Sequence, residues 1–308
     1  MTDALHPRHA SRPSRVLPIA LPIGLLVTVL GSLWALSETP AAIEAVLPPA
    51  PAIVAQLPGI ALEGSVAADP CAEPMVIEAL GAGDSETAIA GFGGGTAFRD
   101  AVVSENAPCI SLSDPEHPWV VVNKARPLDP VDHVPGALAG VSVPTTTSSN
   151  SMREDTAAAL DAMGAALRDA GAGALGVNNG YRSYDLQMRN YRGYVNSSGQ
   201  AGADASSARP GHSEHQTGLA VDVVSCSGGC GGIEGFGGTQ EAIWIAENAW
   251  RYGFIVRYED GETAVTGYIP EPWHLRYIGP ALAAAYHEGG YHSLEDFFGL
   301  PAAPDYDH

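Results

Sequence analysis

Two short segments of the sequence carry residue types that bind first-row metal ions. The first reads SEHQTGLAVD and offers His215 and Asp222, seven positions apart. The second reads EPWH and offers His274, with Glu271 three positions before it. Two imidazoles and one carboxylate form a ligand set that zinc accepts while leaving a fourth position for water. The spacing therefore makes a zinc site with an open coordination position possible.

The chemistry that such a site supports is hydrolysis. Zinc lowers the pKa of a water molecule to about 7 and polarises a carbonyl group. A carboxylate beside the metal that does not bind it, such as Glu271, can take the proton of the water and pass it to a leaving amine. His212, three residues before His215, is an alternative ligand. The choice between these two histidines stays open on spacing alone.

The segments around these residues predict an α+β fold, in which a small antiparallel sheet is flanked by helices and the zinc lies in a cleft. Apolar positions Leu160, Met163 and Leu167 predict a helix over residues 153–170. Ser183 and Thr239 are N-cap residues for two further helices, the second ending near Tyr252. Strands are predicted at residues 119–123 and 174–178, and a hairpin at residues 254–258 and 263–269.

The N-terminus predicts an exported, membrane-attached protein. Residues 16–36 form an uncharged apolar run, long enough for a transmembrane helix of roughly 20 residues. Arginines precede the run and acids follow it, so we expect residues 1–15 to stay in the cytoplasm and the remainder to be extracytoplasmic. A cleaved signal peptide is the alternative. Residues 37–70, rich in Ala, Pro and Val, are expected to be a linker.

Composition excludes several classes of partner. The chain has 308 residues, of which 45% are hydrophobic, and its formal net charge is −20. A folded protein is expected, and a nucleic-acid partner is not, because phosphate binding needs an excess of Lys and Arg.

The four cysteines suit an exported protein. We favour the pairs Cys71–Cys109 and Cys226–Cys230, the first closing a small module at residues 71–113 that serves as a spacer or a wall-binding element.

The motifs resemble a known family. The pattern S-x-H-x-x-G-x-A-x-D, followed by E-x-W-H, resembles the VanY-type zinc D-Ala-D-Ala carboxypeptidases, which belong to a larger group with lysostaphin-like and hedgehog domains. Further matches are Tyr181-Arg182-Ser183, Gly253-Phe254-Ile255 and Thr266-Gly267-Tyr268. They occur in family order within residues 118–298, which we take as the zinc peptidase domain, followed by a tail at residues 299–308.

The resemblance implies a role for individual residues of this chain. It implies that the zinc ligands are His215, Asp222 and His274. It implies that Glu271 is the catalytic base and that Arg182 stabilises the oxyanion, a role that suits a permanently charged guanidinium. Ser213 and Gln187 are implied to contact the substrate.

Two features depart from the family pattern. Asn179 stands where the family commonly has serine, and we expect this to change only local hydrogen bonding. The glycine-rich residues 227–238, together with the neighbouring cysteine pair, resemble an insertion that could border the cleft.

The expected function is removal of the terminal D-Ala from a peptidoglycan stem peptide that ends in D-Ala-D-Ala, with Zn²⁺ as cofactor. An endopeptidase or a D-Ala-D-Ala dipeptidase of the same group is the alternative. A non-catalytic, zinc-stabilised wall-binding domain is a third hypothesis, which the presence of Glu271 and Arg182 disfavours.

Overall fold

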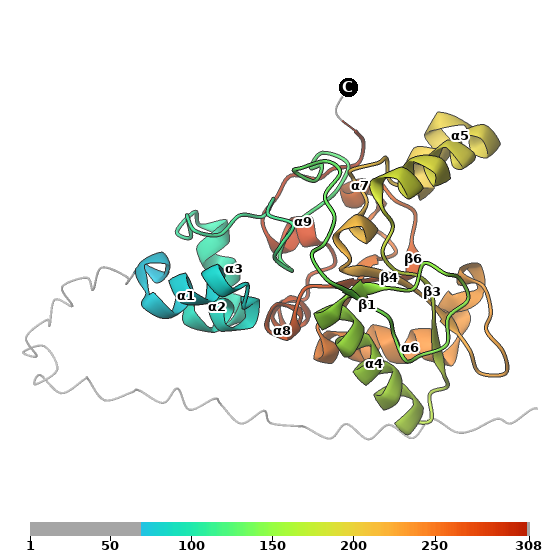
Figure 1. Ribbon diagram of the computed structural model, residues 1–308, viewed down its shortest axis with the longest axis horizontal. Helices are drawn as coiled ribbons and strands as arrows, with labels where there is room; N and C mark the ends of the chain where they lie inside the picture. The colour runs from blue at the N-terminus through green and yellow to red at the C-terminus, as the bar shows by residue number, and fades with distance from the viewer. Residues whose placement is uncertain (1–68, 307–308) are drawn as a thin grey trace, which may run out of the picture. The chain divides into compact units, whose positions relative to one another are not determined.

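The computed structural model describes residues 69–306 of the chain, and Figure 1 shows the arrangement of their elements. Helices surround two small antiparallel sheets, which confirms the mixed fold expected from the sequence. The predicted cytoplasmic tail and the predicted membrane segment at residues 16–36 lie outside the described residues, as does nearly all of the linker. Within the part of the chain that is described, no helix has the length and apolar character needed to cross a bilayer.

The main sheet has four antiparallel strands in the order β3-β4-β6-β5. The strands are β3 (Leu175–Asn179), β4 (Ala220–Ser225), β5 (Phe254–Tyr258) and β6 (Glu271–Tyr277). Strand β3 confirms the strand expected at residues 174–178. Because successive side chains point to opposite faces of a sheet, Val221 and Val223 enter the main apolar core, whereas Asp222 points to the other face.

Helix α4 (Glu154–Asp169) confirms the first predicted helix and covers one face of the main sheet, on the same side as α6 (Figure 1). Leu160, Met163 and Leu167 are fully buried there. A two-stranded sheet of β1 (Leu138–Ala139) and β2 (Met152–Arg153) leads into α4. The apolar stripe read from the sequence therefore faces the sheet that carries the site.

Both predicted N-caps are present. The Ser183 hydroxyl accepts a hydrogen bond from the Leu186 amide at the start of α5 (Tyr184–Ser206). Thr239 caps α6 (Gln240–Asn248) in the same way, and the 3-10 helix η5 (Ala249–Tyr252) continues it to the predicted end. The remaining helices of residues 207–306 are η3 (Glu214–Thr217), η4 (Ile233–Gly238), α7 (Thr263–Thr266), α8 (Pro280–Glu288) and α9 (Leu294–Phe297).

The cysteine-closed segment at residues 71–113 is helical and packs on the C-terminal helices. It contains η2 (Pro70–Ala72), α1 (Pro74–Ala82), α2 (Ser85–Gly91) and α3 (Gly95–Val103). Phe98 of α3 lies in one apolar cluster with Leu282 of α8 and Phe297 of α9. Both predicted disulfides, Cys71–Cys109 and Cys226–Cys230, are present. The segment thus buries its apolar faces against the C-terminal helices rather than within itself alone.

The strand predicted at residues 119–123 is wrong. Residues 119–123 pair with no described strand, and the carbonyl of Val120 accepts a hydrogen bond of 2.7 Å from the guanidinium of Arg276, so it is not free to join a ladder. Trp119 and Val121 pack in the cluster of the N-terminal helices, and Val120 packs in the main core. The β-branched content was thus a signal of burial on both faces, not of strand pairing.

The predicted hairpin is wrong in its second strand. Strand β5 pairs with β6, and the intervening residues form the short helix α7. The carbonyl of Glu262 accepts hydrogen bonds from the amides of Val265 and Thr266 and from the Thr266 hydroxyl, which closes this turn locally. Pro270, which has no amide hydrogen, then separates the turn from β6.

Candidate functional site

The structure brings together the three residues expected to bind the metal. His215 lies on η3, Asp222 on β4 and His274 on β6, and one potential ligand atom from each lies within 4.8 Å of the others. Asp222 Oδ1 is 3.3 Å from His215 Nε2 and 3.3 Å from His274 Nδ1. All three side chains are buried. A single cation between them would contact two imidazoles and a carboxylate.

Each imidazole is oriented by a hydrogen bond on its outer nitrogen. His215 Nδ1 lies 2.8 Å from the carbonyl oxygen of Gly180, and His274 Nε2 lies 3.1 Å from Glu214 Oε2. Because both partners are acceptors, the outer nitrogens carry the hydrogens, so a neutral ring presents the lone pair of its inner nitrogen to Asp222. Metal-binding histidines in proteins are oriented in this way.

Two atoms at the centre of the cluster are buried without a hydrogen-bond partner. They are His215 Nε2 and Asp222 Oδ1. Buried polar atoms in proteins almost always have a partner, so two orphaned acceptors aimed at one point need an explanation. A divalent cation held between them would supply it, and the nitrogen–oxygen donor set suits zinc. The residues present therefore fit the metal expected from the sequence.

Glu271 begins β6 beside the cluster. Its Oε2 atom is 3.7 Å from His274 Nδ1, and its side chain lines the cleft. Burial raises the pKa of Glu271 to about 7, with a smaller opposing effect from His274. A carboxylate with a pKa near neutrality is suited to accept a proton and to return it. Its position fits the predicted base.

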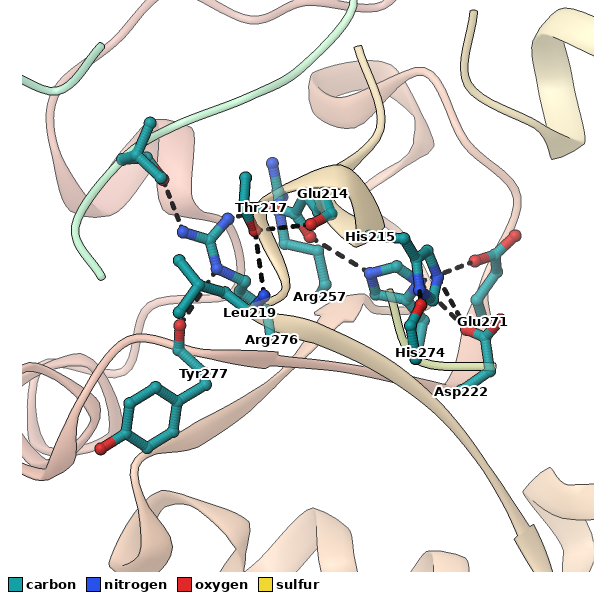
Figure 2. A network of polar contacts seen from close by, with 12 residues as sticks. Glu214, His215, Thr217, Leu219, Asp222, Arg257, Glu271, His274, Arg276 and Tyr277 are labelled. Carbon is teal, nitrogen blue, oxygen red and sulfur yellow. Dashed lines mark hydrogen bonds and ion pairs between the residues drawn. The ribbon is translucent and has the colours of Figure 1, made fainter. Parts of the chain in front are cut away.

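Glu214 is a buried acid that our sequence analysis did not single out. Its Oε1 atom accepts hydrogen bonds of 2.9 Å from Arg257 and 2.9 Å from Arg276, while Oε2 faces His274. Figure 2 shows Glu214 between these guanidinium groups and the imidazole. Burial raises its pKa, but the two arginines outweigh burial and hold the pKa of Glu214 well below its usual range. Glu214 thus stays charged and fixes the ring of His274.

A second buried acid extends this network. Glu295 accepts hydrogen bonds from both terminal nitrogens of Arg257, at 3.1 and 2.8 Å, and from the amide of Asn123 at 2.8 Å. Arg257 lies on β5 and Arg276 on the neighbouring strand β6, and both side chains are completely buried. The signal available in the sequence was two arginines within strand-like apolar runs, since such buried cations need acidic partners.

The cluster lines a cleft of about 260 Å³. Arg182 and Ser213 line this cleft, as predicted for residues that contact the substrate. Arg182 forms no ion pair within residues 69–306, and its Nε atom is buried without a hydrogen-bond partner. The Arg182 amide donates a hydrogen bond to the carbonyl of His215, which holds it beside the cluster. Its guanidinium is therefore available to an oxyanion.

Gln187 does not line the cleft, contrary to expectation. It is fully buried in α5, and its side-chain amide donates hydrogen bonds to the Ala208 carbonyl at 2.7 Å and the Ser207 hydroxyl at 3.3 Å. Ser207 and Ala208 themselves line the cleft. Gln187 therefore supports the wall from behind because its helix turns it inward.

His212, the alternative ligand, points away from the cluster. Its Nδ1 atom is 2.8 Å from the carbonyl oxygen of Asn123, and its ring packs edge-on against Tyr306.

Asn179 has a more specific role than a local change. Its amide donates a 3.1 Å hydrogen bond to Asp222 Oδ2, which leaves Oδ1 as the atom that faces the two histidines.

Comparisons with known proteins agree with this geometry. Residues 149–280 match the VanY family model, described as D-alanyl-D-alanine carboxypeptidase. The putative carboxypeptidase YodJ of Bacillus subtilis (strain 168) is 36% identical over 192 residues, which are 61% of this chain and 69% of that protein. A D-alanyl-D-alanine carboxypeptidase of Enterococcus faecium is 41% identical over 104 residues, 33% of this chain and 29% of that protein.

One solved structure is also similar to this chain. The LD-carboxypeptidase LdcB, whose structure is described as revealing the molecular basis of peptidoglycan recognition, has 37% sequence identity and a TM-score of 0.56. The match covers 61% of this chain and 88% of that one. The segment matched by the family model contains the three clustered residues, Glu271 and Arg182.

Proposed function

Because the chain belongs to the VanY-type family of D-alanyl-D-alanine carboxypeptidases, we propose that it is a zinc-dependent peptidase that removes the terminal D-Ala from peptidoglycan stem peptides ending in D-Ala-D-Ala. The observation that carries this proposal is the buried triad of His215, Asp222 and His274, with orphaned ligand atoms, beside Glu271 in a cleft.

Each residue of the site has a separate role in the proposed reaction. Zinc held by His215, Asp222 and His274 would act as a Lewis acid on the scissile carbonyl and acidify water. Glu271 accepts a proton from the attacking water and delivers it to the nitrogen of the departing D-Ala. Arg182 donates hydrogen bonds to the oxygen that becomes negative as the carbonyl carbon turns tetrahedral. Glu214 and Gly180 keep the two imidazoles in place.

A second candidate differs only in the bond that is cut. The likeness to LdcB favours an LD-carboxypeptidase, which would remove D-Ala from a tetrapeptide stem instead of a pentapeptide stem. The same triad and the same base would serve both reactions, and the shape of the cleft would select the substrate. A D-Ala-D-Ala dipeptidase or an endopeptidase would also use this apparatus.

Product analysis with matched substrates tests the proposal. The zinc-loaded full chain is incubated separately with a stem pentapeptide, a stem tetrapeptide, free D-Ala-D-Ala and a cross-linked dimer, and the products are identified by mass spectrometry. Release of one D-Ala from the pentapeptide is the expected result. Cleavage of the tetrapeptide alone establishes the LD activity, and cleavage of the dipeptide or the dimer alone establishes the other two. No cleavage by a zinc-loaded, folded protein contradicts the assignment as a peptidase.

We further propose that residues 16–36 attach the chain to the cytoplasmic membrane, with the catalytic part outside the cytoplasm. An apolar run of this length after three arginines supports that orientation. Fractionation of cells that produce the full chain should place it in the membrane, and external protease should digest the catalytic part. Recovery of a shortened chain from the medium would instead establish cleavage of the segment.

A further inference from the structure

The glycine-rich segment that follows β4 forms one wall of the cleft. Ile233 and Glu234, at the start of η4, line the cleft, and Phe236 is 1% exposed in the main apolar core. A segment with so many glycines would not hold two side chains in position by itself, because glycine costs more backbone entropy to order than other residues. Burial of Phe236 is one anchor that offsets this cost.

Three further contacts fasten this wall. The Cys226–Cys230 disulfide closes the beginning of the segment. The hydroxyl of Ser227, at the start of the segment, donates a hydrogen bond to the buried carboxylate of Glu241. Near the other end, a Cβ added to Gly237 would lie only 2.8 Å from the ring of Pro272. The wall therefore lies directly against the residue that follows Glu271.

Basic and acidic side chains both line the cleft. Arg182 lies near His215, since the Arg182 amide donates a hydrogen bond to the His215 carbonyl. Glu234 belongs to the wall that touches Pro272, the residue after Glu271. In the proposed substrate only one residue, D-Ala, follows the scissile bond, and its side chain is a methyl group, so an ammonium group on a peptide side chain must lie before that bond.

Glu234 is the one acid of the cleft without a compensating partner among residues 69–306. Of the four acids that line the cleft, Glu214 is paired with two arginines, and Asp222 and Glu271 lie within the central cluster. Glu234 is exposed, and no described residue forms an ion pair or a hydrogen bond with its side chain. Its charge is free to bind a group of the substrate.

We propose that Glu234 is a specificity-determining residue that binds a primary ammonium group carried by the substrate on the N-terminal side of the scissile bond. This inference rests on the proposed function. Ile233 offers an apolar contact to a methylene chain, and Glu234 offers a charge-assisted hydrogen bond to the ammonium at its end. The favoured substrates are stem peptides whose diamino acid retains a free amine. Peptides in which that amine is part of a cross-link amide are disfavoured.

The test compares two pentapeptides that end in D-Ala-D-Ala and have lysine at the third position, one with a free and one with an acetylated side-chain amine. For the full chain, kcat/KM should be higher for the free amine by roughly fivefold, as expected for a partly exposed charge pair. In Glu234→Gln the value for the free-amine peptide should fall to that for the acetylated one. Glu234→Lys should prefer a peptide with a succinylated lysine.

A matched control separates this role from general electrostatics. Glu247 is an exposed acid on α6 outside the cleft, and Glu247→Gln should retain the wild-type preference. Cleavage of both peptides without a preference, or a preference that survives in Glu234→Gln, overturns the role of Glu234 and leaves the proposed function intact. If the zinc-loaded protein cleaves no stem peptide at all, the proposed function fails and this inference fails with it.

Discussion

Asp222 and His274 lie directly opposite each other on the antiparallel strands β4 and β6, with Asp222 Oδ1 3.3 Å from His274 Nδ1. Strand register therefore sets the distance between two of the three predicted metal ligands. A shift by one residue would turn His274 to the opposite face of the sheet, where Leu275 now packs in the core. The apolar core that fixes the register thus also fixes the metal centre.

Replacement of His215 by alanine should abolish stoichiometric zinc binding, because a site with two ligands left holds the metal weakly. His212→Ala is the matched control, since the ring of His212 is hydrogen-bonded to the Asn123 carbonyl and does not face Asp222. Metal content of the dialysed proteins, measured by atomic emission, checks both. The reverse pattern, with zinc lost in His212→Ala and kept in His215→Ala, would assign the ligand to His212.

Glu271→Gln should keep the fold and the bound zinc but lower kcat by about a hundredfold or more, because an amide cannot accept the proton of the water. The substitution keeps the shape of the side chain. Rates on the stem peptide and the metal content of the same sample are the two measurements. Undiminished turnover with full zinc occupancy would show that Glu271 is not the base.

Glu214→Gln should destabilise the protein by about 3–5 kcal/mol, because it leaves two buried guanidinium groups without their shared carboxylate. The exposed acid Glu288 gives a control, and Glu288→Gln should change stability by less than about 0.5 kcal/mol. Urea unfolding of both variants provides the comparison. Equal midpoints for Glu214→Gln and Glu288→Gln would mean that the buried network contributes little.

The buried network should also make stability fall in acid. Burial raises the pKa of Glu295, but Arg257 and the hydrogen bonds it receives lower it more, so the pKa lies below the ordinary value of 4.5. A carboxyl whose pKa is lower in the folded state stabilises the protein at a pH above its unfolded pKa. That contribution is lost as pH falls below about 4.5 and through the folded value.

Glu295→Gln should accordingly be less stable than wild type at pH 7, and the difference should shrink as the pH is lowered toward 3. Urea midpoints at pH 7, 5, 4 and 3 check the prediction, with Glu288→Gln as the control that keeps the wild-type slope. A constant difference between Glu295→Gln and wild type over this range would exclude Glu295 as a source of the acid sensitivity.

Local signals in the sequence predicted local structure well. Ser183 and Thr239 begin helices because their side chains cap free amides within three residues. The spacing of the apolar residues Leu160, Met163 and Leu167 matches the helical period, so it predicted a helix without knowledge of distant contacts. Both disulfides join the cysteines that we favoured because each pair lies in one local segment of the chain.

Signals that depend on a distant partner were less informative. The β-branched run at residues 119–123 looked like a strand, but its Val120 carbonyl accepts a hydrogen bond from Arg276. The segment after β5 looked like the second strand of a hairpin, but β6 has that place. Gln187 matched a substrate-contacting position, and its helix turned it toward Ser207. In each case the outcome depended on a contact with a remote part of the chain.

The sequence by itself determined the chemistry of the site: imidazoles and a carboxylate for a metal, an acid for a base and an arginine for an oxyanion. Only the tertiary structure decided that His215 and not His212 faces Asp222, and that Glu214 holds the ring of His274. The physical reason is that residue type sets what a side chain can bind, whereas strand register and buried charge pairing set what it meets.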